Sequence, residues 1–242
     1  MGKEQTLIEH LRSKQLLLNL GPRLDARLSD FSGPSWAEII SAIEQLFAGT
    51  IQRCFIYGEP NTGKTHLLAA ACQAYSERQH STLLLSLREL TRSHQPDALQ
   101  YLEHHDLITL DDIEIIVDLR EWQEALFHLL NRAQQNDTRL ILAARASPSQ
   151  LGLVIPDLIS RLQQAACYRI PNGDNDADRQ AVLQAALGRR NLALDPEIIK
   201  YLLIKGPRYI GLLLKHLTYL EESSIRQRKR LTLNFVKQLT EK

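Results

Sequence analysis

The octapeptide GEPNTGKT, residues 58–65, decides which fold this sequence can adopt. It matches the pattern G-x-x-x-x-G-K-[ST], in which glycines let successive backbone N–H groups turn toward a polyphosphate at the positive end of a helix. The β-rich run RCFIY (53–57) precedes it, and the helix-forming run THLLAAACQAYSERQ (65–79) follows it. A strand before and a helix after are the context of a phosphate-binding P-loop, which a chance glycine-rich turn would not need, so we expect a nucleotide site here.

An acid on a neighbouring strand completes the predicted site. Lys64 is expected to reach the outer phosphates, and the Thr65 hydroxyl is expected to ligate Mg²⁺. The run LITLDD (107–112) places Asp111 at the carboxyl edge of a buried strand, where it can position the same ion through the nucleotide, although such an acid can also be a helix N-cap. The expected cofactors are ADP or ATP with Mg²⁺. The candidate nucleotide-binding residues are Gly58, Glu59, Pro60, Asn61, Thr62, Gly63, Lys64, Thr65, His66 and Asp111, with Thr65 and Asp111 as metal ligands.

The residues expected around the γ-phosphate are unusual for a hydrolase. Asp112 stands where many such ATPases place a water-activating glutamate, but the shorter aspartate reaches an attacking water poorly, so we assign it a supporting catalytic role. The fourth predicted strand ends in Ala143 and Ala144, where a polar side chain would be needed to orient water, and Arg145 follows with no predicted target. The sequence therefore predicts a site that binds phosphate better than it hydrolyses it.

The order of apolar segments predicts an α/β fold. Buried strands that alternate with helices indicate a parallel sheet covered by helices on both faces. Ser35 and Glu38 have capping-box spacing at the start of the first helix. After the polar break at 171–176 only helices are expected, which predicts a small all-α domain, with Asp195-Pro196 at one helix start. The predicted strands are 53–57, 82–87, 106–112, 138–144 and 167–170, and the predicted helices are 34–48, 65–79, 97–104, 121–135, 155–165, 176–189, 196–204, 208–227 and 234–240.

Composition excludes several classes of protein. Lys+Arg 29 against Asp+Glu 28 leaves a net charge of +1, so charge alone indicates neither a nucleic-acid nor a membrane partner. Cys54, Cys72 and Cys167 are far apart in the sequence, which argues against a disulfide framework or a zinc knuckle. We find neither a signal-peptide pattern nor an apolar run near the ~20 residues that span a bilayer. We expect a cytoplasmic protein with no membrane partner.

Four segments, two of them overlapping the predicted nucleotide site, carry a resemblance to a known family. GKTHLL (63–68), LDDIE (110–114), IPDLISRL (155–162) and RLTLNFVKQL (230–239) together resemble the DnaA-related AAA+ proteins, and within them the Hda group of regulatory inactivators of DnaA. The resemblance implies an AAA+ P-loop NTPase domain over 31–170, a helical lid domain over 171–242 and an N-terminal tail over 1–30. A replication initiator would continue into a helix-turn-helix DNA-binding domain, so the resemblance favours the Hda group.

The same resemblance implies two functional elements outside the nucleotide site. Hda-like proteins bind the DNA polymerase sliding clamp through a peptide Q-L-x-L-x-L, which QLLLNL (15–20) matches. An amphipathic helix that packs on its own domain is the alternative for these leucines. The clamp-binding candidates are Gln15, Leu16, Leu18 and Leu20.

Arg161 in IPDLISRL matches the family's arginine finger, which acts in trans on a neighbour's nucleotide. A surface ion pair with Asp157 at i,i+4 is its alternative. The implied function is negative regulation of replication initiation by an adaptor, expected to be ADP-bound, that contacts DNA only indirectly and stimulates hydrolysis of DnaA-bound ATP. The partners are the sliding clamp and DnaA, and the sequence allows a homo-oligomer.

One departure from the family concerns the lid. Gly211 occupies the position where AAA+ lids contribute an arginine to the bound nucleotide, with Arg208 three residues earlier as a substitute to be tested. With Ala143 and Ala144, this predicts weak or no intrinsic hydrolysis. Two alternatives stay open: an autonomous AAA+ ATPase of the helicase-loader type that acts on DNA, and a nucleotide-gated scaffold without catalysis in trans. Vigorous ATP turnover by the isolated protein would favour the autonomous ATPase.

Overall fold

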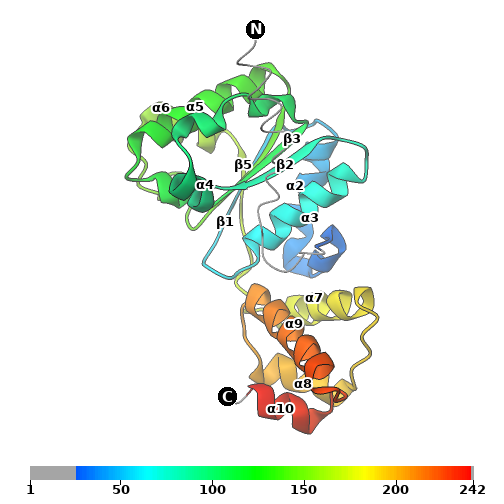
Figure 1. The fold of residues 1–242 in the computed structure, drawn as a ribbon. Helices are drawn as coiled ribbons and strands as arrows, with labels where there is room; N and C mark the ends of the chain where they lie inside the picture. Colours follow the sequence, from blue (N-terminus) through cyan, green and yellow to red (C-terminus); the bar gives the residue numbers. More distant parts are fainter. Residues whose placement is uncertain (1–25, 241–242) are drawn as a thin grey trace.

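The structure, a computed structural model, describes residues 26–240 in an α/β part and a helical part. In Figure 1 the helical part lies below the end of the sheet at which β1 connects to α3. The predicted clamp-binding residues Gln15, Leu16, Leu18 and Leu20 lie outside the described residues. Across residues 26–240, every helix is too short or too polar to span a bilayer.

A parallel sheet forms the centre of the α/β part, as the sequence predicts. Its five strands lie in the order β2-β3-β4-β1-β5, and all neighbours are parallel. The middle strands are nearly continuous apolar runs because both of their faces are buried. The strands are β1 (Arg53–Tyr57), β2 (Thr82–Ser86), β3 (Leu107–Asp111), β4 (Arg139–Ala144) and β5 (Ala166–Arg169).

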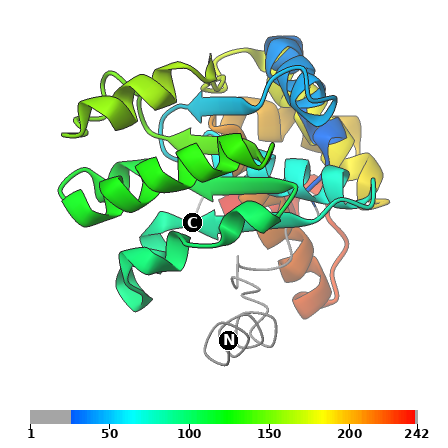
Figure 2. The same ribbon diagram turned by 90° about the horizontal axis from the view of Figure 1, so that it is seen from above.

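Helices cover both faces of this sheet (Figures 1 and 2). Alternate residues of β1 point to opposite faces, so Ile56 packs into one apolar cluster and Phe55 into the other. The cluster around Ile56 includes α2 (Ala37–Phe47) and α3 (Lys64–Ser76). The cluster around Phe55 includes α4 (Leu87–Ser93), α5 (Arg120–Gln135) and α6 (Pro156–Gln163).

The helical part consists of four helices that share the first cluster. Leu183, Leu213 and Leu217 are buried there, each from the apolar side of its helix. Asp195 precedes the first residue of α8, Pro196, as predicted. The four predicted helices are confirmed as α7 (Asp176–Arg189), α8 (Pro196–Lys205), α9 (Ile210–Gln227) and α10 (Leu233–Thr240).

Three local predictions are wrong. The helix expected over 97–104 is two 3-10 turns, Pro96–Leu99 and Leu102–His104, because Tyr101 between them adopts a left-handed φ of 61°. Helix α4, directly after β2, was not predicted.

The capping box is the third error. A 3-10 turn (Pro34–Trp36) comes first, and α2 begins at Ala37 with Trp36 in the cap position. The Ser35 amide instead donates to Asp178 Oδ1 in α7, at 3.0 Å. A long-range contact thus takes the place of the expected local one.

Candidate nucleotide-binding site

The P-loop connects the carboxyl end of β1 to α3. Asn61 and Gly63 adopt positive φ angles of 66° and 103°, and α3 begins at Lys64. Gly63 suits its conformation because it lacks a Cβ. The Thr62 hydroxyl donates to the Glu59 carbonyl at 2.8 Å and closes the turn. The loop therefore wraps around the N-terminus of a 13-residue helix, whose dipole attracts anions.

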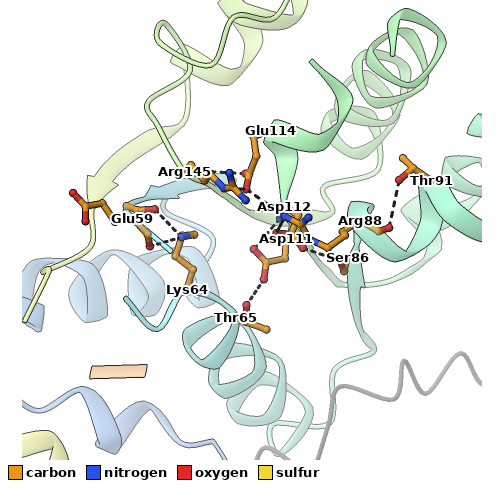
Figure 3. Close-up of polar contacts among 11 residues, drawn as sticks. Glu59, Lys64, Thr65, Ser86, Arg88, Thr91, Asp111, Asp112, Glu114 and Arg145 are labelled. Carbon is orange, nitrogen blue, oxygen red and sulfur yellow. Dashed lines mark hydrogen bonds and ion pairs between the residues drawn. The ribbon is translucent and has the colours of Figure 1, made fainter. Parts of the chain in front are cut away.

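Lys64 lies across the loop that it follows. Its ammonium donates to the carbonyl oxygens of Gly58 at 2.7 Å and Glu59 at 2.8 Å (Figure 3). Burial lowers the pKa of Lys64, while the carboxylates of Asp111 and Glu114 oppose that shift. The cation is thus held at the mouth of the loop, where the sequence predicts contact with the outer phosphates.

Thr65 and Asp111 lie together, as the sequence predicts for a pair that positions Mg²⁺. The Thr65 hydroxyl donates to Asp111 Oδ2, and the Asp112 amide donates to Asp111 Oδ1 at 2.8 Å. Asp111 is buried at the end of β3, and this burial raises its pKa despite the Thr65 hydrogen bond. A hydroxyl and a carboxylate oxygen side by side are the hard ligands that Mg²⁺ prefers, so these residues fit the ion. The helix N-cap alternative fails, since Asp112 rather than Asp111 precedes the next turn.

Asp112 points toward β2 and α4, away from Thr65 (Figure 3). Its carboxylate accepts from Ser86 Oγ at 3.0 Å and from Arg88 Nη2 at 3.1 Å. A left-handed φ of 60° at Asp112 turns the chain so that the two consecutive acids diverge. Asp112 therefore braces the ends of β2 and β3.

Glu114 and Arg145 form an ion pair that sequence reasoning missed. Glu114 Oε1 lies 2.8 Å from Arg145 Nε, and the Arg145 amide donates to Glu114 Oε2 at 3.2 Å. Arg88 approaches the same carboxylate at 3.9 Å. The third acid in LDDIE was the available signal for Glu114. Arg145 thus has a target: it extends from the end of β4 toward the carboxylates beside Lys64 (Figure 3).

The lid contacts the P-loop directly. The Gly211 amide donates to the Asn61 carbonyl at 3.1 Å, and the Tyr209 hydroxyl donates to Glu59 Oε2 at 2.7 Å. A Cβ on Gly211 would lie 2.6 Å from the Asn61 oxygen. Arg208 is exposed and has no hydrogen bond or ion pair with any residue in 26–240. Tyr209 was missed because no pattern in the sequence marks it.

The sensor-like alanines are part of the sheet core. Ala143 and Ala144 are fully buried and pair with Ile56 and Tyr57 of β1. They carry no group that could reach a nucleotide, which agrees with their predicted inability to orient water.

His66 belongs to a buried cluster beneath the loop. Its Nε2 lies 3.1 Å from Asp30 Oδ2, and its ring packs against Phe31 with centroids 5.5 Å apart. Arg189 of α7 donates to the same Asp30 oxygen. The structure therefore places His66 with the lid and the preceding segment, and apart from Lys64 and Thr65.

Arg161 lies near the amino end of β1, whereas the P-loop follows the carboxyl end of the same strand. Its Nη1 donates to Gln134 Oε1 at 3.2 Å and to Gln164 Oε1 at 3.4 Å, and the predicted alternative, an ion pair with Asp157, does not form. Its carbonyl accepts from Arg53 Nη1 at 3.4 Å. Arg53 is the first residue of β1, whereas the P-loop follows the last, about 15 Å away at 3.3 Å per residue.

Comparisons with known proteins agree with this architecture. The sequence profile of the bacterial DnaA ATPase domain matches residues 36–168, and the profile of the Hda lid domain matches residues 176–240. An uncharacterized protein of Haemophilus influenzae is 31% identical over 229 residues, which make up 94% of this chain and 98% of that protein.

Solved structures show the same fold. Domain III of the Thermotoga maritima replication initiation protein DnaA superposes with a TM-score of 0.75 at 19% identity, over 90% of this chain and 96% of that one. AMPPCP-bound DnaA from Aquifex aeolicus gives a TM-score of 0.65 at 23% identity, over 81% of this chain. This chain spans about two thirds of the length of such DnaA chains. The chain therefore belongs to the DnaA-related AAA+ family, with a nucleotide-binding domain of the bacterial DnaA type and a lid domain of the Hda type.

Proposed function

We propose that this protein is a clamp-dependent regulatory adaptor that inactivates the replication initiator DnaA. It binds the DNA-loaded sliding clamp through residues 15–20, packs its AAA+ domain against ATP-bound DnaA, and presents Arg161 to the nucleotide of that partner. Hydrolysis in DnaA then leaves the ADP form and prevents re-initiation. The protein contacts DNA only indirectly.

One observation carries this proposal: Arg161 and the protein's own P-loop lie at opposite ends of β1. An arginine finger stabilises charge on the transferred phosphoryl group and has to touch it. Because Arg161 lies beside the first residue of β1 and the P-loop follows the last, about 15 Å along the strand, it cannot reach a nucleotide held by its own chain. The nucleotide it serves has to be on another chain.

The protein's own site supports binding of a nucleotide more than its hydrolysis. Gly58, Lys64, Thr65 and Asp111 would hold ADP or ATP with Mg²⁺, and the ion would neutralise phosphate charge when bound. The alanines at the end of β4 and the glycine at 211 leave the γ-phosphate without two of its usual polar neighbours. We propose that the acting form carries ADP and that this nucleotide has a structural role.

The clamp peptide suits a groove-binding role. A glutamine side chain can hydrogen-bond to a groove, and Leu16, Leu18 and Leu20 can fill adjacent apolar pockets, so four anchors fall within six residues. Such an arrangement brings the adaptor to DNA that carries a clamp.

The test measures hydrolysis of ATP bound to DnaA from the same source, with clamp loaded on DNA. Wild-type protein is expected to accelerate hydrolysis, and Arg161→Ala is expected to abolish the acceleration while clamp binding is unchanged. Acceleration that survives in Arg161→Ala would remove the finger assignment.

A second candidate is an autonomous AAA+ ATPase of the helicase-loader type. The complete set of Lys64, Thr65 and Asp111 favours it, since an adaptor needs no hydrolytic site of its own. ATP turnover by the isolated protein separates the two. Rapid turnover that Lys64→Ala abolishes would support the ATPase.

A further inference from the structure

Two guanidinium groups lie side by side near the start of β1. Arg53 Nη2 donates to Gln134 Oε1 at 2.8 Å, and Arg161 Nη1 donates to the same oxygen at 3.2 Å. Arg53 comes from β1, Arg161 from α6 and Gln134 from α5, so three elements of the fold bring them together. The neutral amide oxygen of Gln134 is their common acceptor.

In the part of the chain that the structure describes, these two positive charges have no counter-charge. Within residues 26–240, neither Arg53 nor Arg161 has a carboxylate oxygen within ion-pair distance. Their other acceptors, the Arg161 carbonyl and Gln164 Oε1, are neutral and lie at 3.4 Å. Burial, together with the charge of Arg161, lowers the pKa of Arg53. Arg88, Arg132 and Arg145 of the same domain differ, because each contacts an acid.

A hollow in the surface adjoins Arg53, and Arg161 is linked to its lining by a hydrogen bond to Gln164. Arg53 and Gln164 line a depression of about 470 Å³, together with Ile51, Gln52, Ala165 and Ala166. Both guanidiniums are only partly buried, and each keeps donors that these neutral acceptors do not use. Two planar forks that converge beside an open depression can bind several oxygens of one phosphate chain.

The geometry points to a single anion site made by Arg53 and Arg161, which binds the terminal phosphates of a nucleotide held in the P-loop of another chain. This inference rests on the proposed function and adds a second arginine to it. The two arginines share the charge that develops on the phosphoryl group, so the finger is half of a pair. The bound anion removes the repulsion between the two guanidiniums, and this relief adds to the affinity for the phosphates.

The first experiment measures hydrolysis of DnaA-bound ATP at saturating adaptor. Arg53→Gln is expected to lower the saturated rate on the order of tenfold, because the arginine stabilises charge that develops in the transition state. Arg53→Lys restores the charge without the fork and is expected to recover part of the rate. Arg226→Gln, an exposed arginine of α9, is the matched control and should behave as wild type.

Gln134→Ala separates contact from positioning. It removes the shared acceptor and leaves both charges, so we expect it to keep most of the stimulation. If Gln134→Ala lost as much stimulation of hydrolysis as Arg53→Gln, Arg53 would only hold Arg161 in place. That result would overturn the shared site. A wild-type rate for Arg53→Gln beside an inactive Arg161→Gln would also overturn it, while the proposed function would stand.

A second experiment is independent of DnaA. In a Lys64→Ala background the P-loop lacks its lysine, and we expect tripolyphosphate to bind this variant weakly. Adding Arg53→Gln or Arg161→Gln to that background should each weaken tripolyphosphate binding on the order of tenfold. Calorimetry measures this directly. Tripolyphosphate binding that neither substitution changes, or no binding at all, contradicts the anion site whatever the outcome with DnaA.

Discussion

Gly211, at the start of α9, donates its backbone N–H to the carbonyl oxygen of Asn61 in the P-loop, at 3.1 Å. A Cβ at this position would lie 2.6 Å from the Asn61 oxygen and 3.2 Å from its carbonyl carbon. The glycine at the lid position where the resemblance to the family implies an arginine is thus part of a close backbone contact. At this position the lid contacts the P-loop through its backbone, and Gly211 offers no side chain to the phosphates.

Gly211→Ala is therefore expected to destabilise the protein by about 1–3 kcal/mol, because backbone atoms would have to move. Gly188 in α7 is the matched control, since a Cβ there meets no atom within 4 Å. Gly188→Ala should stabilise by about 0.5–1 kcal/mol from helix propensity. Urea unfolding measures both, and equal effects of the two substitutions would show that the lid does not pack on the P-loop in this way.

Asp111→Asn should raise the free energy of unfolding and abolish Mg²⁺-dependent nucleotide binding. Burial raises the pKa of Asp111, so its ionised form is disfavoured in the folded protein. The neutral amide removes this cost and should add about 1 kcal/mol at pH 7, an advantage that fades as the pH falls and the carboxyl becomes protonated. Mg²⁺-dependent nucleotide binding should be lost.

Asp112→Asn is the control for that change, because Asp112 contacts Arg88 rather than Thr65. This variant should keep the Mg²⁺ dependence of nucleotide binding, and its free energy of unfolding should fall by less than about 1 kcal/mol. Thermal unfolding and nucleotide titration with and without Mg²⁺ check both variants. Retained Mg²⁺ dependence in Asp111→Asn would exclude Asp111 as the metal-positioning acid.

Asp30 should account for part of the protein's acid sensitivity. Burial alone would raise its pKa, but hydrogen bonds from His66 and the Arg27 amide and the charge of Arg189 lower it below 3.8. A lowered carboxyl pKa contributes stability that is complete well above 3.8 and is lost as the pH falls through the folded value. Asp30→Asn should therefore cost about 3 kcal/mol at pH 7.

The same substitution should flatten the loss of stability in acid, because the titrating group is gone. Asp157→Asn, at an exposed site on α6, is expected to change neither quantity. Chemical unfolding from pH 7 to pH 3 provides the comparison. An unchanged acid limb in Asp30→Asn would mean that the cluster of Asp30, His66 and Arg189 does not join the lid to the α/β part energetically.

The proposed clamp peptide can be tested by changing the fixed and the variable positions of its motif separately. Gln15→Ala with Leu18→Ala should abolish binding to the sliding clamp, because it removes the hydrogen-bonding anchor and a central apolar one. Leu17→Ala with Asn19→Ala changes the two variable positions and should bind nearly as wild type. Surface-bound clamp with labelled protein gives the affinities. Equal binding by both double variants would indicate that the leucines act within the protein's own fold and do not bind the clamp.

Much of the fold was predictable because its signals are local. The buried strands, the P-loop and the lid helices follow from apolar runs and turn residues, and the pairing of Thr65 with Asp111 follows from the meeting of strand ends in a parallel sheet. One error arose where a distant residue decides the local structure, and another where the backbone conformation of a single residue does. Asp178 holds Ser35 and overrides a local cap, and the left-handed Tyr101 divides an expected helix.

The candidate site shows the same division. The spacing of LDDIE predicts acids at a strand end but not which partner each one takes, and Asp112 turns to Arg88 while Glu114 binds Arg145. Arg53 could not be recognised from the sequence, because a lone arginine at the start of a strand has no pattern. Only the fold places it beside Arg161.

The proposed function depends on Arg161 acting on a nucleotide of another chain. The most direct measurement mixes this protein with ATP-bound DnaA and DNA-loaded clamp, and follows the DnaA-bound nucleotide with Arg161→Ala and Lys64→Ala in parallel. We expect Arg161→Ala to abolish conversion to ADP without changing ATP turnover by the isolated protein. Conversion that persists in Arg161→Ala, or turnover that falls in the isolated Arg161→Ala protein, would contradict the proposed function.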